Sequence, residues 1–174
     1  NYYHKTDKRN NHNPLPEDGM HGLCQEGFSA AIYLYRNNFE ESELGDTCNC
    51  VDDSWNKFDY YQYDYYDSIH VYEMVKMTYE SATNADVGPI YLHCWNGWHA
   101  SGYISAVILK QFCGYSNWDA VNYWDLGTDG ANTSPRYQKQ RERIKDFTPY
   151  EEFMISDSLQ DCLCPPMPEN IDSS

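Results

Sequence analysis

Blocks of apolar residues along the chain predict strands and helices in turn. Short runs rich in aromatic and branched residues predict strands at 28–35, 58–66 and 90–92. Helical spacing of apolar residues and flanking capping signals predict helices at about 68–82, 100–112, 116–124 and 135–147. Strands that alternate with helices predict an α/β fold with a mainly parallel central sheet and helices on both faces.

Capping residues support the ends of these helices. Ser68 is the expected N-cap of the first, and Gly114 closes the second. Ser116, with Asp119 three residues later, forms a capping box for the third. Ser134, which precedes a proline, starts the fourth.

The two ends of the chain differ in composition from its middle. Residues 1–20 are polar, Asn-rich and interrupted by prolines, so they predict an extended arm. Residues 162–174 carry three prolines and predict an extended tail. Residues 21–161 between them are expected to form one α/β domain, which is long enough to bury a core.

The arm also carries apolar side chains that are unusual in a solvent linker. They are Tyr2, Tyr3, Leu15 and Met20. Extended segments of this kind bind a sheet edge or lie across a partner's surface, so we expect the arm to contact a neighbouring copy and form a homo-oligomer. The alternative is that the arm folds back on its own domain or frays.

The charge balance is strongly acidic, which narrows the choice of partners. The chain has 12 Lys and Arg against 27 Asp and Glu, a formal net charge of -15 and a pI near 4.5. It should be repelled by nucleic acid and by anionic membranes. No apolar run has the length of a transmembrane helix, so membrane insertion is not expected. No cofactor is expected. Because the chain starts at Asn1, we interpret it as a processed product whose signal peptide has been removed.

Seven cysteines indicate an oxidising compartment. If Cys94 is set apart, six remain, and an even remainder fits three disulfides of unknown connectivity. The candidates are Cys24, Cys48, Cys50, Cys113, Cys162 and Cys164. Reduced thiols and a cysteine-rich zinc site are the open alternatives, although no His flanks either Cys-x-Cys pair and we expect no metal. The sequon at Asn132 agrees with a secreted glycoprotein.

The stretch from Pro89 to Gly102, PIYLHCWNGWHASG, carries the candidate chemistry. A buried strand runs into Cys94, a tight turn follows around Gly97, and a helix begins at about Ala100. This arrangement directs backbone N–H groups and a helix N-terminus at one point, which favours an anion or a thiolate there.

This loop resembles the phosphate-binding loop of cysteine-dependent protein tyrosine and dual-specificity phosphatases. That pattern is His-Cys, five residues, Arg, then Ser or Thr, and His93, Cys94, Gly97 and Ser101 fall in register with it. The resemblance covers roughly 22–147 and implies a three-layer phosphatase-like domain. The position of the family's arginine is Ala100. Losing a bidentate charged contact costs several kcal/mol at the transition state, so a pseudophosphatase is expected.

The resemblance also implies roles for single residues. Cys94 would be the nucleophile, His93 would order the loop, and Ser101 would hydrogen-bond the sulfur. Asp64, 30 residues before Cys94, would be the general acid, with Asp67 as the second candidate. The structural alternatives are a small buried thiol at Cys94, a helix-capping Ser101 and a helix start at Asp67.

The loop as a whole is the expected anion- or ligand-binding segment. It comprises Cys94, Trp95, Asn96, Gly97, Trp98, His99, Ala100 and Ser101. The two tryptophans are either a platform for a ligand or a plug that fills the space of the missing arginine.

Five cations lie in the last predicted helix: Arg136, Lys139, Arg141, Arg143 and Lys145. They form either a patch for polyanions or a solvated helix face, and the interleaved Glu142 and Asp146 favour the solvated face.

The sequence therefore predicts a secreted, disulfide-stabilised pseudophosphatase that acts as a binding or self-assembly module for a glycan, an anion or a protein. The alternative is an active, atypical phosphatase in which His99, or a cation such as Arg136, replaces the missing arginine.

Overall fold

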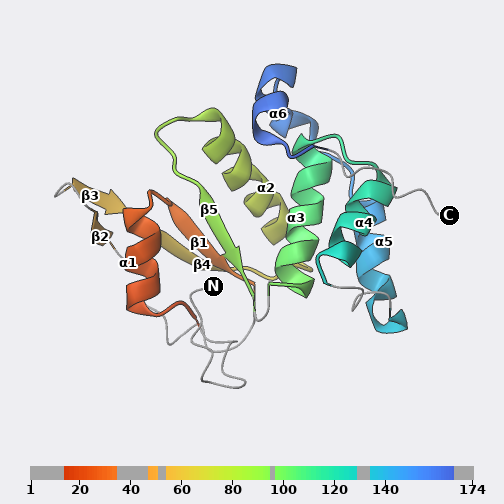
Figure 1. The fold of residues 1–174 in the computed structure, drawn as a ribbon, viewed down its shortest axis with the longest axis horizontal. Coiled ribbons are helices and arrows are strands. Elements are labelled where there is room, and N and C mark those ends of the chain that lie inside the picture. The colour runs from red at the N-terminus through yellow and green to blue at the C-terminus, as the bar shows by residue number, and fades with distance from the viewer. Residues whose placement is uncertain (1–13, 35–46, 51–53, 95–96, 129–133, 167–174) are drawn as a thin grey trace. The chain divides into compact units, whose positions relative to one another are not determined.

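The computed structural model describes residues 14–34, 47–50, 54–94, 97–128 and 134–166, and for 47–50 and 54–57 the backbone alone (Figure 1). The fold is mixed α/β. The chain divides into two compact units, residues 1–101 and 102–174. This division falls inside the stretch 21–161 that the sequence predicted as a single domain.

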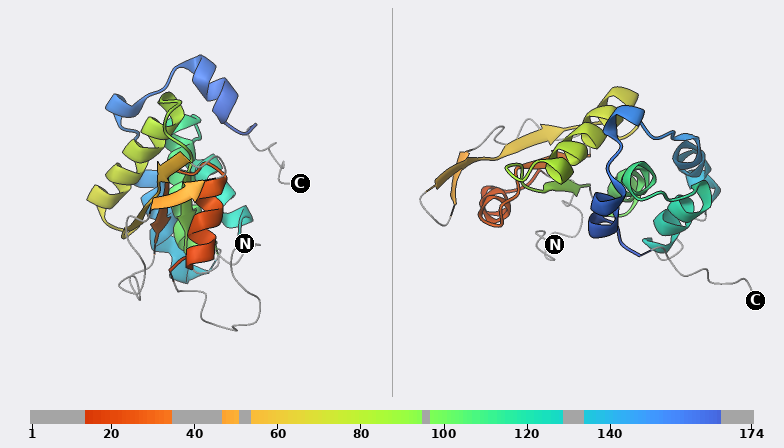
Figure 2. Two further views of the ribbon diagram at one scale, coloured as in Figure 1. Left: turned by 90° about the vertical axis from the view of Figure 1, so that its left-hand side faces the viewer. Right: turned by 90° about the horizontal axis from the view of Figure 1, so that it is seen from above.

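The first unit is built on a three-stranded parallel sheet. Its strand order is β4 (Asp59–Gln62), β1 (Ala30–Tyr33) and β5 (Ile90–His93). Each strand overlaps a run of aromatic and branched residues that predicted it. Helices α1 (Glu17–Gln25) and α2 (Ser68–Thr83) lie on opposite faces of this sheet (Figure 2).

Alternation along β1 divides the core of this unit between the two faces. Ala31 and Tyr33 belong to a buried cluster that includes Met20 and Leu23 of α1 and Tyr60 of β4. Successive side chains of a strand point to opposite faces, so these two share the α1 side. Helix α2 contacts β5 and buries a helical stripe made of Val71, Met74 and Val75, as its spacing predicted.

The N-terminal arm was predicted to be extended to residue 20, and this is wrong for its last part. Helix α1 begins at Glu17, and Leu15 and Met20 are 3% and 2% exposed within the core of their own unit. These two side chains therefore pack into their own unit instead of reaching a neighbour, because burying them in this core removes their apolar surface from water. Tyr2 and Tyr3 lie outside the described residues.

A second, two-stranded sheet lies between the strands predicted at 28–35 and 58–66. Strands β2 (Thr47–Cys50) and β3 (Ser54–Lys57) pair antiparallel, with Thr47 opposite Lys57. An antiparallel ladder is held by backbone hydrogen bonds, so the polar sequence of these strands gave no apolar alternation from which to predict it.

The second unit is helical. It contains α3 (His99–Phe112) from Gly102 onward, α4 (Asn117–Leu126), α5 (Gln138–Asp146) and α6 (Asp157–Leu163), with short 3₁₀ helices η3 (Pro135–Tyr137) and η4 (Glu151–Phe153). The predicted capping box of Ser116 and Asp119 is confirmed, as is the start at Ser134. At α2 the N-cap is Asp67, one residue before the predicted Ser68, because its carboxylate accepts the Ile69 N–H.

Two adjacent residues of α3 fasten the chain that follows α5. Lys110 is 7% exposed, and its ammonium donates to the carbonyls of Ile144, Lys145 and Phe147 and to the Asn117 side chain, at 2.6–3.0 Å. The Gln111 amide both donates to the Tyr150 carbonyl and accepts the Tyr150 N–H. The buried ammonium thereby satisfies the unpaired carbonyls at the C-terminus of α5.

The cationic helix is only partly a solvated face. Arg141 is 9% exposed and forms a bidentate pair with Asp125, at 2.9 and 3.2 Å, while its guanidinium lies over the Trp124 ring. Arg136, Lys139 and Lys145 are exposed, as the solvated interpretation requires. Arg141 instead joins α5 to α4, and its guanidinium is engaged in the ion pair with Asp125.

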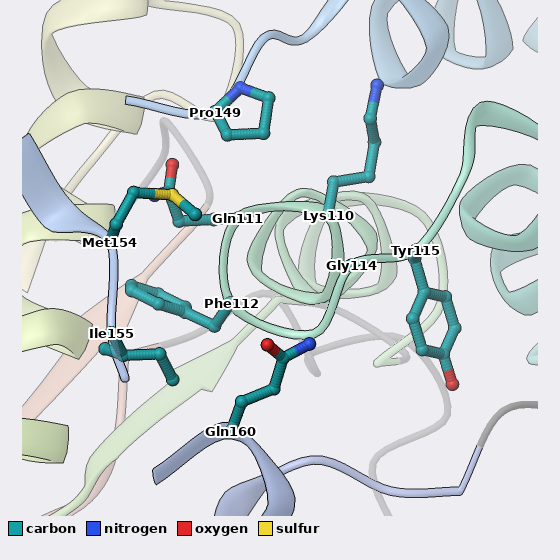
Figure 3. Close-up of a pocket in the computed structure, with 9 residues that line it drawn as sticks. All are labelled: Lys110, Gln111, Phe112, Gly114, Tyr115, Pro149, Met154, Ile155 and Gln160. Atoms are coloured by element: carbon teal, nitrogen blue, oxygen red, sulfur yellow. The ribbon is translucent and has the colours of Figure 1, made fainter. Parts of the chain in front are cut away.

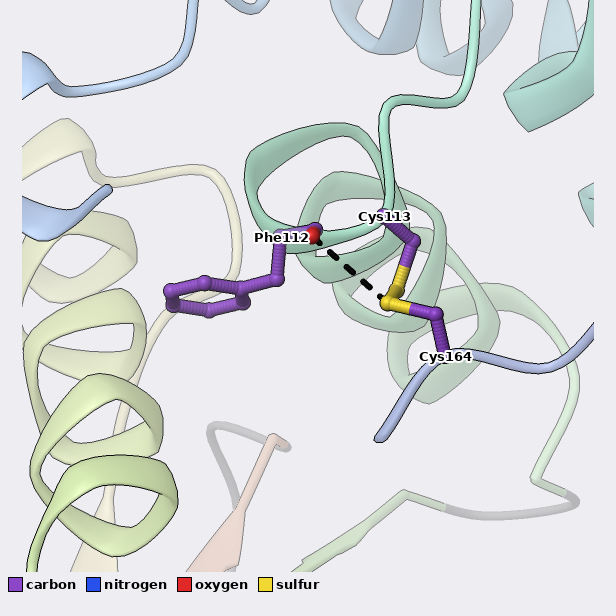
Figure 4. The surroundings of a disulfide bond; sticks show 3 residues. All are labelled: Phe112, Cys113 and Cys164. Atoms are coloured by element: carbon purple, nitrogen blue, oxygen red, sulfur yellow. Dashed lines mark hydrogen bonds between the residues drawn. A yellow bond between two sulfur atoms is a disulfide. The ribbon is translucent and has the colours of Figure 1, made fainter. Parts of the chain in front are cut away.

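A disulfide joins Cys113, just after α3, to Cys164, just after α6 (Figure 4). The Cys164 sulfur also lies 3.5 Å from the Phe112 carbonyl oxygen. Helix α6 has no buried residue of its own. The covalent bond is thus the main tie that holds α6 against the end of α3.

Candidate functional site

The site begins at the carboxyl end of β5, where Cys94 leaves the sheet. The Cys94 side chain is 4% exposed and carries a free thiol. Its sulfur lies 3.3 Å from the hydroxyl oxygen of Ser101, itself 7% exposed, and either group can donate this hydrogen bond. The two residues that the loop pattern places seven apart are therefore in direct contact.

The loop between them turns directly into a helix. Gly97 has φ +75°, a conformation that side chains with a Cβ rarely adopt, and α3 begins two residues later at His99. Ala100 and Ser101 thus stand in the first turn of α3, where N–H groups and the helix dipole favour negative charge. Trp95 and Asn96 lie outside the described residues.

The position at which the resemblance places an arginine is a buried methyl group. Ala100 is 4% exposed, so no cation enters the site from this position. His99 packs edge-to-face with Trp98, at 6.3 Å between ring centroids. Trp98 is 37% exposed, so this indole keeps surface that a ligand could contact and is not a fully buried plug.

Asp64 lies in the turn that follows β4. Its carboxylate accepts the Tyr66 N–H at 2.9 Å, its carbonyl accepts the Asp67 N–H, and its own N–H donates to His70 Nδ1 at 3.0 Å. These bonds hold Asp64 in a defined turn beside the start of α2. Asp67 is exposed and caps α2, which supports its interpretation as a helix start.

Tyr65 links this turn to the loop, and the sequence did not single it out. Burial, followed by a hydrogen bond with Tyr66, raises the pKa of the Tyr65 phenol, and the charges of Asp64 and Cys94 act in the same direction. Because β4 and β5 are both parallel to β1, Asp64 and Tyr65 after β4 and Cys94 after β5 lie at the same edge of the sheet. The available signal was the place of Tyr65 in the turn after a strand, next to the candidate acid.

His93 lies among aromatic rings in the first unit. It shares a strand face with Tyr91, and its ring stacks on Tyr33, Tyr60 and Tyr91 at centroid distances of 5.1–5.7 Å. Its Nε2 lies 2.7 Å from the Tyr60 hydroxyl, which also accepts the Leu15 N–H at 2.8 Å. Burial lowers the pKa of His93 to about 3, so the imidazole is neutral and shares a hydrogen bond with the Tyr60 hydroxyl.

The surroundings of the site are aromatic and acidic. Tyr61 stacks on Tyr63, and Tyr63 stacks on His70. Burial raises the pKa of both phenols, with Asp59 adding to the effect at Tyr61 and Glu73 at Tyr63. The segment 58–75 contains four carboxylates and neither Lys nor Arg. This segment therefore opposes the approach of an anion.

The cysteines follow the predicted pattern in part. Cys113 and Cys164 are bridged, and Cys24 is also in a disulfide. Cys162 is free and exposed, so its predicted bridging is wrong. Cys162 lies within α6, whereas Cys164 is its C-cap and has extended backbone, so the chain leaves the helix at Cys164 and brings this residue, not Cys162, to Cys113. The side chains of Cys48 and Cys50, and Asn132, lie outside the described part.

Within the described ranges, no group of three or more His, Cys, Asp or Glu side chains is arranged to hold a metal ion. None of the helices described is long and apolar enough to cross a membrane.

No protein-family model, curated protein sequence or solved structure matches the chain. The function is therefore inferred from the residues of the site itself.

Proposed function

We propose that this protein is a secreted, phosphatase-like domain without effective catalysis, which uses the Cys94 loop and its aromatic surroundings as a binding module. The observation that carries the proposal is the Cys94–Ser101 contact, at 3.3 Å, across a loop in which Ala100 replaces the cation. The disulfide Cys113–Cys164 favours the extracellular location, since such bonds persist in oxidising compartments.

The arrangement around Cys94 supports a loop built like the phosphate-binding loop of the phosphatases. A strand delivers the thiol, a helix starts five residues later, and the turn after β4 carries Asp64 toward the same sheet edge. In parallel sheets, ligands bind beyond the carboxyl ends of the strands.

The local charge supports loss of phosphatase chemistry. A phosphoryl group carries negative charge that a bidentate cation must stabilise as the transition state forms. Ala100 offers none, and the nearby segment 58–75 is acidic. A glycan or a protein surface that stacks on Trp98 and the tyrosines is a better match to this site than a phosphate ester.

One observation favours the alternative of a weakly active phosphatase. Asp64 follows β4 and Cys94 follows β5, so a carboxylic acid and the thiol lie at the same edge of the parallel sheet, as acid catalysis requires. His99 is adjacent to Ala100 in the chain and would then have to supply the positive charge. This alternative predicts turnover that disappears when Cys94 is replaced.

The test compares hydrolysis of an aryl phosphate by the native chain and by Cys94→Ser. We expect equal background rates, because the cation that stabilises the transition state is missing. Ala100→Arg should raise the affinity for vanadate at least tenfold, since it restores a fork at the helix N-terminus. Ala85→Arg adds the same charge at an exposed position and is the matched control.

Turnover by the native chain that Cys94→Ser abolishes would refute the loss of catalysis. If Ala100→Arg binds vanadate no better than Ala85→Arg, the loop is not an anion cradle, and the phosphatase-like interpretation fails with it.

A further inference from the structure

A pocket in the second unit lies outside the Cys94 site. It opens between the C-terminal end of α3, the segment 149–155 and Gln160 of α6, with a volume of about 310 Å³ (Figure 3). This volume is at the lower end of the range for sites that bind small molecules.

One side of the pocket is apolar. Phe112, Pro149, Met154 and Ile155 contribute ring, thioether and aliphatic surface to it. Met154 is 58% exposed, which is unusual for a large apolar side chain beside a concave surface. A ligand that covered this wall would gain hydrophobic stabilisation.

Lys110, the one charged residue that lines the pocket, already has hydrogen-bond partners. The Lys110 ammonium donates to four acceptors around the end of α5, and Figure 3 shows it directed away from Gln160. The pocket therefore presents no available positive charge to an anion. The Gln111 amide is likewise bonded at both ends to the Tyr150 backbone.

Gln160 supplies the available polar group. Its side-chain amide is directed toward the end of α3 in Figure 3 and forms no hydrogen bond to the described part of the chain. Gly114, at φ +66°, leaves room beside it: a Cβ there would lie 3.3 Å from the Gln160 amide nitrogen. A primary amide can both donate to and accept from another primary amide.

We propose that this pocket binds a small neutral molecule with a planar apolar body and a carboxamide group, which pairs with Gln160 and packs against Phe112 and Met154. The Cys113–Cys164 bond is part of the site, because it holds α6, and with it Gln160, at the end of α3. The ligand class follows from the lining: apolar surface, one available amide and no available charge.

The experiment titrates the full chain with benzamide while following the methyl resonances of ¹³C-labelled methionine, of which the chain has five. We expect the Met154 methyl to shift with a Kd of about 1 mM, a value suited to so small a ligand. Benzoate has the same shape with a negative charge, and it should bind at least tenfold more weakly.

Gln160→Leu keeps the size of the side chain and removes its amide, so it should weaken benzamide binding five- to tenfold. Gln138→Leu makes the same change on exposed α5, where Gln138 pairs with Glu142, and should leave the Kd unchanged. Replacing both Cys113 and Cys164 by Ser should also weaken binding at least fivefold, because α6 is then released.

Absence of a Met154 shift at saturating benzamide, or equal affinities for Gln160→Leu and Gln138→Leu, would overturn the proposal. An unchanged Kd in the double cysteine variant would show that binding does not need the disulfide, and would overturn that part of the proposal.

Discussion

At the residue scale, His93 and Lys110 are two buried polar groups that the fold stabilises in different ways. His93 is kept neutral and hydrogen-bonded to Tyr60, whereas Lys110 is surrounded by four acceptors that compensate its buried charge. Burial lowers the pKa of both groups. We therefore expect each of the two residues to affect the unfolding free energy in its own way.

His93 should make the protein sensitive to acid. Its pKa is about 3 in the folded protein against 6.5 without burial, so the folded state binds fewer protons in this window. The stabilisation is complete above pH 6.5 and is lost as the pH falls toward 3, at up to about 1.4 kcal/mol per pH unit. His93→Gln should flatten this slope of the unfolding free energy, measured by urea titration at several pH values.

His21→Gln is the control for that series, since His21 is exposed on α1 and should leave the slope unchanged. Equal acid slopes for native protein and His93→Gln would show that His93 is not buried in its neutral form.

Lys110 should be among the most sensitive positions of the second unit. Lys110→Met keeps the aliphatic stem but leaves three carbonyls and the Asn117 side chain without their donor, so we expect a loss of about 3–5 kcal/mol in unfolding free energy. Lys139→Met, at an exposed site of α5, should cost less than about 0.5 kcal/mol. Similar urea midpoints for the two variants would contradict this role of Lys110.

At the scale of elements, the disulfide determines how firmly α6 is attached. Helix α6 has seven residues and none is buried, so packing contributes little to its position. Cys113 and Cys164 are 51 residues apart, and closing a loop of that length stabilises the folded state by roughly 2–4 kcal/mol.

The double Ser variant at Cys113 and Cys164 should therefore unfold at lower urea concentration, and amide hydrogens of 157–163 should exchange faster. Cys162→Ser, which breaks no bond, is the control. Unchanged exchange in α6 of the double variant would show that noncovalent contacts suffice to hold it.

At the scale of the whole molecule, the two free thiols of the described residues differ in how accessible they are to a reagent in solvent. Cys162 is exposed and Cys94 is 4% exposed. Iodoacetamide should modify Cys162 of the folded chain at least a hundredfold faster than Cys94, because burial blocks the reagent. Mapping of the modified peptides by mass spectrometry at successive times measures this ratio, and denaturant should remove the difference. Equal rates without denaturant would mean that the Cys94 loop is open to solvent.

The sequence by itself determined the local features. Short aromatic runs located β1, β4 and β5, apolar spacing located α2, and the capping residues Ser116 and Ser134 located the helices that follow them, because periodicity and capping act within a few residues of the chain. The spacing of Cys94 and Ser101 likewise predicted a contact that a tight turn and a helix start then produce.

Only the tertiary structure decided which distant groups meet. Three features join segments that are far apart in the sequence: the burial that keeps His93 neutral, the bonds of Lys110 to the end of α5, and the position of Tyr65 and Cys94 at one edge of the sheet. The choice of Cys164 over Cys162 depends on where α6 ends and the chain approaches Cys113. Burial and hydrogen bonding between remote segments are properties of packing, and no local pattern in the chain encodes them.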